Sequence, residues 1–155
     1  MRWILNELAP DLVIPDNLVI RPAVPEDHPA CAAVFLAAYR QAFPLHPPEY
    51  YVPERYFESI SGEEQWVATQ AGRIIAVLSI YWPENFIHSL YVDPSVQNRG
   101  IGRRLLEAVV GGAKGVCELK CDKANKRAVA FYKHIGWREV GEGTADTGPW
   151  VRLRK

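Results

Sequence analysis

Runs of apolar residues typical of strands alternate along the chain with runs whose apolar residues recur at helical spacing. The clearest strands are residues 65–70 and 73–82, which are separated by Ala71 and Gly72. A glycine-containing pair between two such runs predicts a β-hairpin. Further strands are expected over 18–23, 85–92, 115–121, 137–141 and 149–155, with a polar loop, 142–147, between the last two.

Helices are predicted between these strands. In 102–110 the apolar residues form one stripe, and Gly111 and Gly112 follow as a stop signal. In 123–136, Asn125 is expected to cap the start and Gly136 the end. Two further helices are predicted at 25–43 and 54–60, separated by the proline-rich segment 44–53.

The order of elements is β-α-α-β-β-β-α-β-α-β-β. This order predicts an α/β fold with a mixed, mostly antiparallel central sheet flanked by helices. We expect an N-terminal extension, residues 1–17, followed by one domain, residues 18–155.

Composition and charge exclude several classes of protein. The formal net charge is zero, which argues against a dedicated nucleic-acid binder. No apolar run approaches the ~20 residues of a membrane helix, and the N-terminus does not resemble a signal peptide, so a cytoplasmic location is expected. Three cysteines, Cys31, Cys117 and Cys121, fit a reducing compartment. Cys117 and Cys121 are expected to be small buried side chains, because no further ligands at matching spacing indicate a metal site.

The segment VDPSVQNRGIGRRLL, residues 92–106, joins a strand to a helix through a glycine-containing loop. A helix start exposes unpaired N–H groups and the positive end of the helix dipole, so such a junction is an anion site. Gly100 and Gly102 allow close approach to a ligand, and Arg99, Arg103 and Arg104 add positive charge nearby. From spacing alone, a simple turn with solvated arginines is an equally good interpretation.

Three segments in the same order resemble the GNAT family of N-acetyltransferases. QNRGIG, residues 97–102, resembles the family's Q/R-x-x-G-x-G/A acetyl-CoA loop. NKRAVAFYKHIGW, residues 125–137, resembles its N-x-x-A-x-x-F-Y-x-x-x-G-F segment, with Trp137 in place of the usual Phe. IRPAVPED, residues 20–27, resembles its first strand and helix cap. The resemblance implies the acyl-CoA N-acyltransferase (GNAT) fold and acetyl-CoA as co-substrate.

The resemblance also implies where the cofactor binds. The sheet of this family opens beside the strand that precedes the loop, so the pantetheine arm would bind there as an added strand. Asn125 matches a position that contacts pantetheine, and this role is compatible with an N-cap. The cofactor-binding residues implied are Leu90, Tyr91, Val92, Gln97, Asn98, Arg99, Gly100, Ile101, Gly102, Arg103 and Asn125.

Tyr132 matches the family's general acid, which protonates the departing CoA thiolate. Pattern alone favours a core aromatic at this position. The base is open. Some members carry a glutamate where this chain has Phe86 or His88, and strand alternation places these two with Leu90 on one face. His88 is the candidate base, with Glu84 or a water molecule as alternatives.

The resemblance therefore implies direct transfer of acetyl from acetyl-CoA to a primary amine of a small molecule or peptide. The acceptor is expected near three segments: 43–57, with its tyrosines, then 81–82 and 142–149. A non-catalytic acyl-CoA sensor is the alternative from another class, and an unrelated phosphate-binding protein is a third. No membrane or nucleic-acid partner is implied, and Trp150 on the last strand is a candidate contact in a homodimer.

Overall fold

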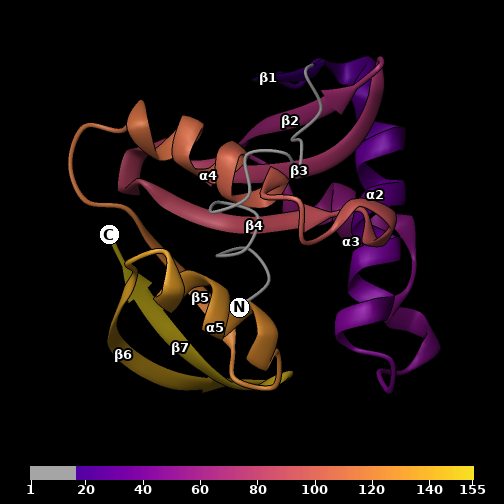
Figure 1. Ribbon diagram of the computed structural model, residues 1–155. Helices are drawn as coiled ribbons and strands as arrows, with labels where there is room; N and C mark the ends of the chain where they lie inside the picture. The colour runs from indigo at the N-terminus through magenta and orange to yellow at the C-terminus, as the bar shows by residue number, and fades with distance from the viewer. Residues whose placement is uncertain (1–16) are drawn as a thin grey trace.

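The computed structural model describes residues 17–155, so nearly all of the predicted extension, residues 1–17, lies outside the described residues. A seven-stranded sheet has the order β1-β2-β3-β4-β5-β7-β6 (Figure 1). Every neighbouring pair is antiparallel except β4 and β5. The strands are β1 (Leu18–Pro22), β2 (Glu64–Gln70), β3 (Arg73–Tyr81), β4 (Phe86–Val92), β5 (Glu118–Asp122), β6 (Arg138–Ala145) and β7 (Gly148–Arg154). The predicted mixed, mostly antiparallel sheet is confirmed.

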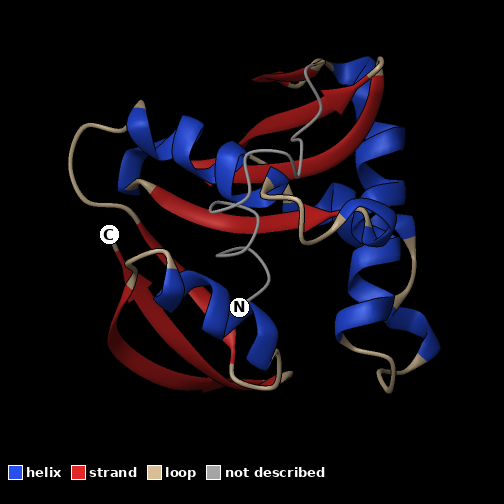
Figure 2. Cartoon of the chain, viewed as in Figure 1, coloured by secondary structure: helices blue, strands red, loops and turns tan. Residues whose placement is uncertain are grey.

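Helices cover both faces of this sheet (Figure 2). The α-helices are α2 (His28–Ala42), α3 (Pro53–Ser59), α4 (Ile101–Gly111) and α5 (Lys126–His134), and the 3-10 turns are η1 (Pro25–Asp27), η2 (Pro48–Tyr50), η3 (Trp82–Glu84) and η4 (Pro94–Val96). One core lies between the sheet and the helices α4 and α5, and a second lies under α2 and α3. All three cysteines are free and buried, and the burial of Cys117 and Cys121 was predicted.

The sheet opens between β4 and β5. These strands pair only at Phe86 with Glu118 and Ile87 with Leu119. Beyond Ile87 they diverge, so β1 to β4 and β5 to β7 form two arms (Figure 1). The register of β4 against β3 also shifts here, because Ile80 pairs with Ile87 and Ser79 with Ser89, which leaves His88 in a β-bulge.

Several boundaries differ from the prediction. The prediction of a polar loop at 142–147 is wrong. The strand β6 continues to Ala145, which pairs with Gly148, so only two residues form the turn. Its polar side chains lie on an edge strand, where most remain exposed, and a polar composition there does not exclude a strand. The strand predicted from 115 begins at Glu118, and the helix predicted from 123 begins after Asn125.

The central hairpin is confirmed. Ala71 has a φ of 50° and Gly72 a φ of 76°, the left-handed pair that a two-residue turn of type I′ requires. Among residues 17–155, no helix combines the length and apolar character needed to cross a bilayer. Over the same residues, His, Cys, Asp and Glu side chains form no cluster of three that could hold a metal ion.

Candidate functional site

A cleft of about 440 Å³ lies where the sheet opens. It is bounded by β4, the loop that follows β4, the start of α4, α5 and the C-terminal end of α2. Ten of the residues implied by the family resemblance line it together: Leu90, Tyr91, Val92, Gln97, Asn98, Gly100, Ile101, Gly102, Asn125 and Tyr132. Arg99, Arg103 and His88 do not line it. Leu90 and Tyr132, 42 positions apart in sequence, are thus brought to one cavity.

The loop after β4 is held by its own side chains. Gln97 donates from Nε2 to the carbonyl of Val92 at 3.0 Å, which closes the loop onto the end of the strand. Asp93 accepts from the backbone N–H of Ser95 at 2.9 Å and pairs with Arg73 at 2.6 Å. Burial opposes ionisation of Asp93, but these hydrogen bonds and the Arg73 charge together hold its pKa below the usual range.

The start of α4 opens onto the cleft. Gly100 is its N-cap residue and has a φ of 76°, a left-handed conformation that glycine adopts without a steric penalty. Because α4 has eleven residues and its first residues, Ile101 and Gly102, line the cavity, the N–H groups of its first turn lie at the cavity wall. This arrangement supplies the positive end of a helix dipole to a ligand in the cleft.

The basic side chains at this wall are not those expected from sequence. Arg103 pairs with Glu107 along α4 at 2.7 Å instead. Lys126 and Arg127, in the first turn of α5, do line the cleft. Arg127 donates to Oδ1 of Asn98 at 2.8 Å, and Asn98 has a φ of 63°. Sequence reasoning missed both residues, although their place directly after the Asn125 cap was a usable signal.

Asn125 and Tyr132 lie on the same helix. The side chain of Asn125 accepts from the N–H of Ala128 at 3.2 Å, which confirms its predicted N-cap role. Tyr132 is 7% exposed, and its ring lies 4.8 Å from that of Phe131 and 5.8 Å from that of Trp137. Burial raises the pKa of its phenol, so it carries its proton at neutral pH. Tyr132 is therefore both a core aromatic and a wall of the cleft.

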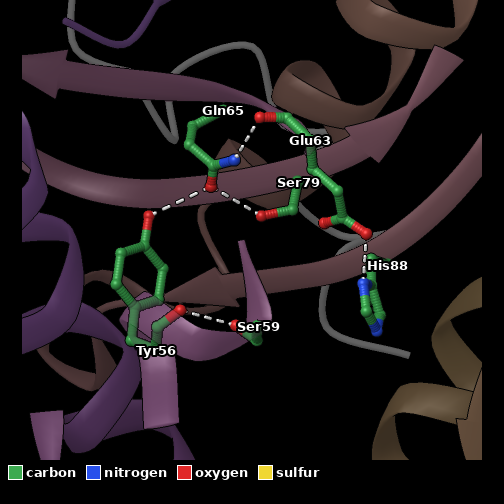
Figure 3. A network of polar contacts seen from close by, with 6 residues as sticks. All are labelled: Tyr56, Ser59, Glu63, Gln65, Ser79 and His88. Atoms are coloured by element: carbon green, nitrogen blue, oxygen red, sulfur yellow. Dashed lines mark hydrogen bonds and ion pairs between the residues drawn. The ribbon is translucent and has the colours of Figure 1, made fainter. Parts of the chain in front are cut away.

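His88 lies at the apex of the opening rather than in the cleft wall. Phe86 and His88 do lie together, with ring centroids 6.2 Å apart. The prediction is wrong for Leu90, because the β-bulge interrupts the alternation and Leu90 packs against the same core as Ile87. His88 instead forms a short hydrogen bond through Nδ1 with Oε1 of Glu63 (Figure 3). Glu63, 25 residues away in sequence, was missed, and no local pattern points to it.

The aromatic segment expected near the acceptor packs largely on itself. Tyr39 contacts His46 through a 2.7 Å hydrogen bond. The guanidinium of Arg55 lies 4.1 Å from the ring centroid of Tyr50, and that of Arg40 lies 5.7 Å from the ring of Tyr51. An arginine thus lies over each of these rings, and neither Tyr50 nor Tyr51 lines the cleft, so packing is the role that the structure supports for them.

Comparison with known proteins agrees with this geometry. The model of the acetyltransferase (GNAT) family matches residues 30–137. "Probable N-acetyltransferase Rv2775" of Mycobacterium tuberculosis is 32% identical over 137 residues, 77% of this chain and 79% of that protein. "N-alpha-acetyltransferase RimI" of the same organism is 43% identical over 56 residues, 36% of this chain and only 35% of RimI.

A solved structure gives the same fold. The PaiA N-acetyltransferase of Thermoplasma acidophilum, in complex with coenzyme A, superimposes with a TM-score of 0.72. It is 18% identical, and the match covers 89% of this chain and 98% of that one. The family match spans most of α2, the strands β4 and β5 and the whole of the cleft wall, and so the chain belongs to the GNAT family of acetyl-CoA-dependent N-acetyltransferases.

Proposed function

We propose that the cleft binds acetyl-CoA and that the chain transfers its acetyl group directly to a primary amine. The observation that carries this proposal is the position of Tyr132. Tyr132, whose phenol carries its proton, lines the same cavity as the start of α4, which supports one site that combines a proposed anion-binding wall with a proposed proton donor. A protein that only bound acyl-CoA would not need the donor.

Different parts of the cleft would bind different parts of acetyl-CoA. The first turn of α4 and the loop containing Gly100 would hold the pyrophosphate. Leu90, Tyr91 and Val92 border the gap where β4 has lost β5 as a partner, so their backbone groups on that side could pair with pantetheine. The thioester would then lie toward the apex of the opening, near Tyr132. Lys126 and Arg127 supply positive charge at the wall.

Two residues handle the protons of the reaction, and the imidazolium and phenolate that they become exchange one proton through solvent to restore the site. The neutral amine attacks the thioester carbonyl carbon, a C–N bond forms and the C–S bond breaks. The proton lost by the amine nitrogen passes to Nε2 of His88. The CoA thiolate takes a proton from the phenol of Tyr132.

The amine of a peptide is the acceptor class we favour. RimI, whose name describes an N-alpha-acetyltransferase, supports this choice. Asp122 ends β5 at the far edge of the gap, and its half-buried carboxylate could hold an ammonium group before deprotonation. Burial raises the pKa of this carboxyl, although the charge of His46 opposes the shift. Assembly as a homodimer through Trp150 stays a prediction.

Calorimetric titration with acetyl-CoA, using NAD and ATP as controls, is the first test. We expect selective binding of acetyl-CoA. Release of CoA should then be measured with a peptide that has a free N-terminus, an N-terminally blocked lysine peptide and spermidine. Turnover with either peptide would support the proposal, and preference for the free N-terminus would identify the α-amine. Turnover with spermidine alone would overturn the peptide class, and binding without turnover on any amine would leave an acyl-CoA sensor.

A further inference from the structure

A carboxylate and an imidazole meet at the apex of the opening. Oε1 of Glu63 is hydrogen-bonded to Nδ1 of His88 (Figure 3). The two side chains differ sharply in exposure: that of Glu63 is 8% exposed and that of His88 is 51% exposed. Oε2 of Glu63 is buried and has no hydrogen-bond partner among the described residues. The carboxylate is thus enclosed, whereas the imidazole reaches solvent.

Buried side chains hold the backbone of Glu63 in place. Gln65 donates from Nε2 to the backbone carbonyl of Glu63 at 3.0 Å. The side-chain oxygen of Gln65 accepts from the hydroxyl of Ser79 at 2.8 Å and from that of Tyr56 at 3.3 Å (Figure 3). Because Gln65, Ser79 and Tyr56 are all buried, this network fixes the backbone that carries Glu63.

The contact determines the tautomer of His88. An ionised carboxylate only accepts hydrogen bonds, so a neutral imidazole that bonds to it must carry its proton on Nδ1. The lone pair is then on Nε2, which points away from Glu63 in Figure 3. A lone pair on the exposed nitrogen is what a proton acceptor needs.

The location fits such a role. His88 is the bulged residue of β4 and directly follows Ile87, the last residue of that strand to pair with β5. The cleft wall on β4 begins two residues later, at Leu90. A strand advances ~3.3 Å per residue, so His88 stands roughly 7 Å beyond the end of that wall, on the path from the cleft to the apex.

We propose that Glu63 is a positioning residue that fixes His88 in the Nδ1–H tautomer, with Nε2 free to accept the proton of the attacking amine. This inference rests on the proposed function for its chemical step. The alternative is an ordinary ion pair with a half-exposed histidine, which would contribute little and would not select a tautomer. The two interpretations predict different results in the following experiments.

The tautomer can be measured in the unaltered protein. Two-dimensional NMR of protein labelled with ¹⁵N-histidine separates a protonated ring nitrogen from an unprotonated one, and His88→Gln identifies the signals. We expect the neutral form of His88 to carry its proton on Nδ1. A proton on Nε2, or an even mixture, would overturn the proposal. Since this measurement needs no acceptor, it determines the tautomer of His88 even if no amine is acetylated.

A double-mutant cycle tests the link to turnover. Glu63→Gln should lower kcat by about 10-fold or more with the Kd for acetyl-CoA unchanged, and His88→Gln should lower it by about 100-fold. If Glu63 acts only through His88, the double variant should match His88→Gln. Multiplicative losses would overturn the proposal, as would full activity of Glu63→Gln. Glu64→Gln, which removes the same charge one residue away at an exposed position, is the control and should retain kcat.

Discussion

Gly102, in the first turn of α4, lies against Val92, the last residue of β4. A β-carbon at residue 102 would approach Cγ2 of Val92 to 3.1 Å and Cδ2 of Leu90 to 3.9 Å. The glycine therefore allows the helix to start directly on the strand. Because Val92, Leu90 and Gly102 all line the cleft, the distance between this helix and this strand sets the width of the end that we propose holds the pyrophosphate.

Replacing Gly102 should separate helix from strand. In Gly102→Val, the added side chain has to displace Val92, so we expect the Kd for acetyl-CoA to rise by about 10-fold or more. The free energy of unfolding should fall by about 1–3 kcal/mol, the usual cost of overpacking. Gly111→Ala, at the other end of α4 with no atom within 4 Å of the new β-carbon, is the matched control. An unchanged Kd in Gly102→Val would remove this glycine from the binding site.

Tyr132→Phe should lower turnover without weakening the binding of acetyl-CoA. The phenyl ring keeps the contacts with Phe131 and Trp137, so the fold and the Kd for acetyl-CoA should change little. Loss of the proton donor should lower kcat by about 10²-fold or more. Tyr81→Phe, at an exposed tyrosine, provides the control for removing one hydroxyl. Equal turnover by Tyr132→Phe and the unaltered protein would exclude the acid role.

The raised pKa of Tyr132 predicts how kcat depends on pH above neutrality. A phenol donates a proton only below its pKa, and burial moves that pKa above the ordinary value of about 10. The donor form should therefore persist to higher pH than in a solvated tyrosine. We expect kcat at saturating substrate to show no decline between about pH 7 and about pH 9.5. A decline in that window that Tyr132→Phe abolishes would contradict the raised pKa.

Local sequence signals were sufficient for most of the fold. Ala71 and Gly72 specify a turn that only a narrow set of residues adopts, and Asn125 caps a helix by a contact three residues away. Both depend on neighbours in sequence, and both were predicted. The β6–β7 hairpin was shortened in the prediction because exposed edge-strand residues such as Glu142 and Thr144 have no apolar alternation to reveal them.

Only the part of the candidate site that lies on one continuous segment was predictable. The cleft wall from Leu90 to Gly102 is nearly one continuous segment, so a motif could identify it. The contact between His88 and Glu63 depends on a bulge in β4 and on a turn before β2, which no pattern in either segment encodes. The bulge also broke the alternation on which the position of His88 had been predicted.

Arg127 should matter more to cofactor binding than the arginines of α4. It lines the cleft and supports Asn98, whose left-handed backbone forms part of the loop. We expect Arg127→Gln to raise the Kd for acetyl-CoA by about 3- to 10-fold, and the difference to shrink at high salt, since screening weakens an exposed charge contact. Arg104→Gln removes the same charge from an exposed residue outside the cleft wall and should leave the Kd unchanged. Equal effects of the two variants would indicate only a general influence of net charge.

Gly143 and Trp150 form a cross-strand pair that stabilises the arm of the sheet beyond the opening. They are register partners in β6 and β7, and a β-carbon at 143 would overlap the indole ring. The ammonium of Lys120 lies 4.3 Å from the centroid of that ring. Gly143→Ala should therefore lower the free energy of unfolding by about 1–3 kcal/mol, measured by chemical denaturation.

Gly141 provides the comparison within the same strand. A β-carbon there would lie 3.8 Å from Cβ of Arg152, an ordinary contact, so Gly141→Ala should be neutral or slightly stabilising. The cost of Gly143→Ala should also disappear in a Trp150→Ala background, because the ring that causes the overlap is gone. If the cost persists without the indole, it arises from the backbone of β6, and the pair does not explain why glycine occupies position 143.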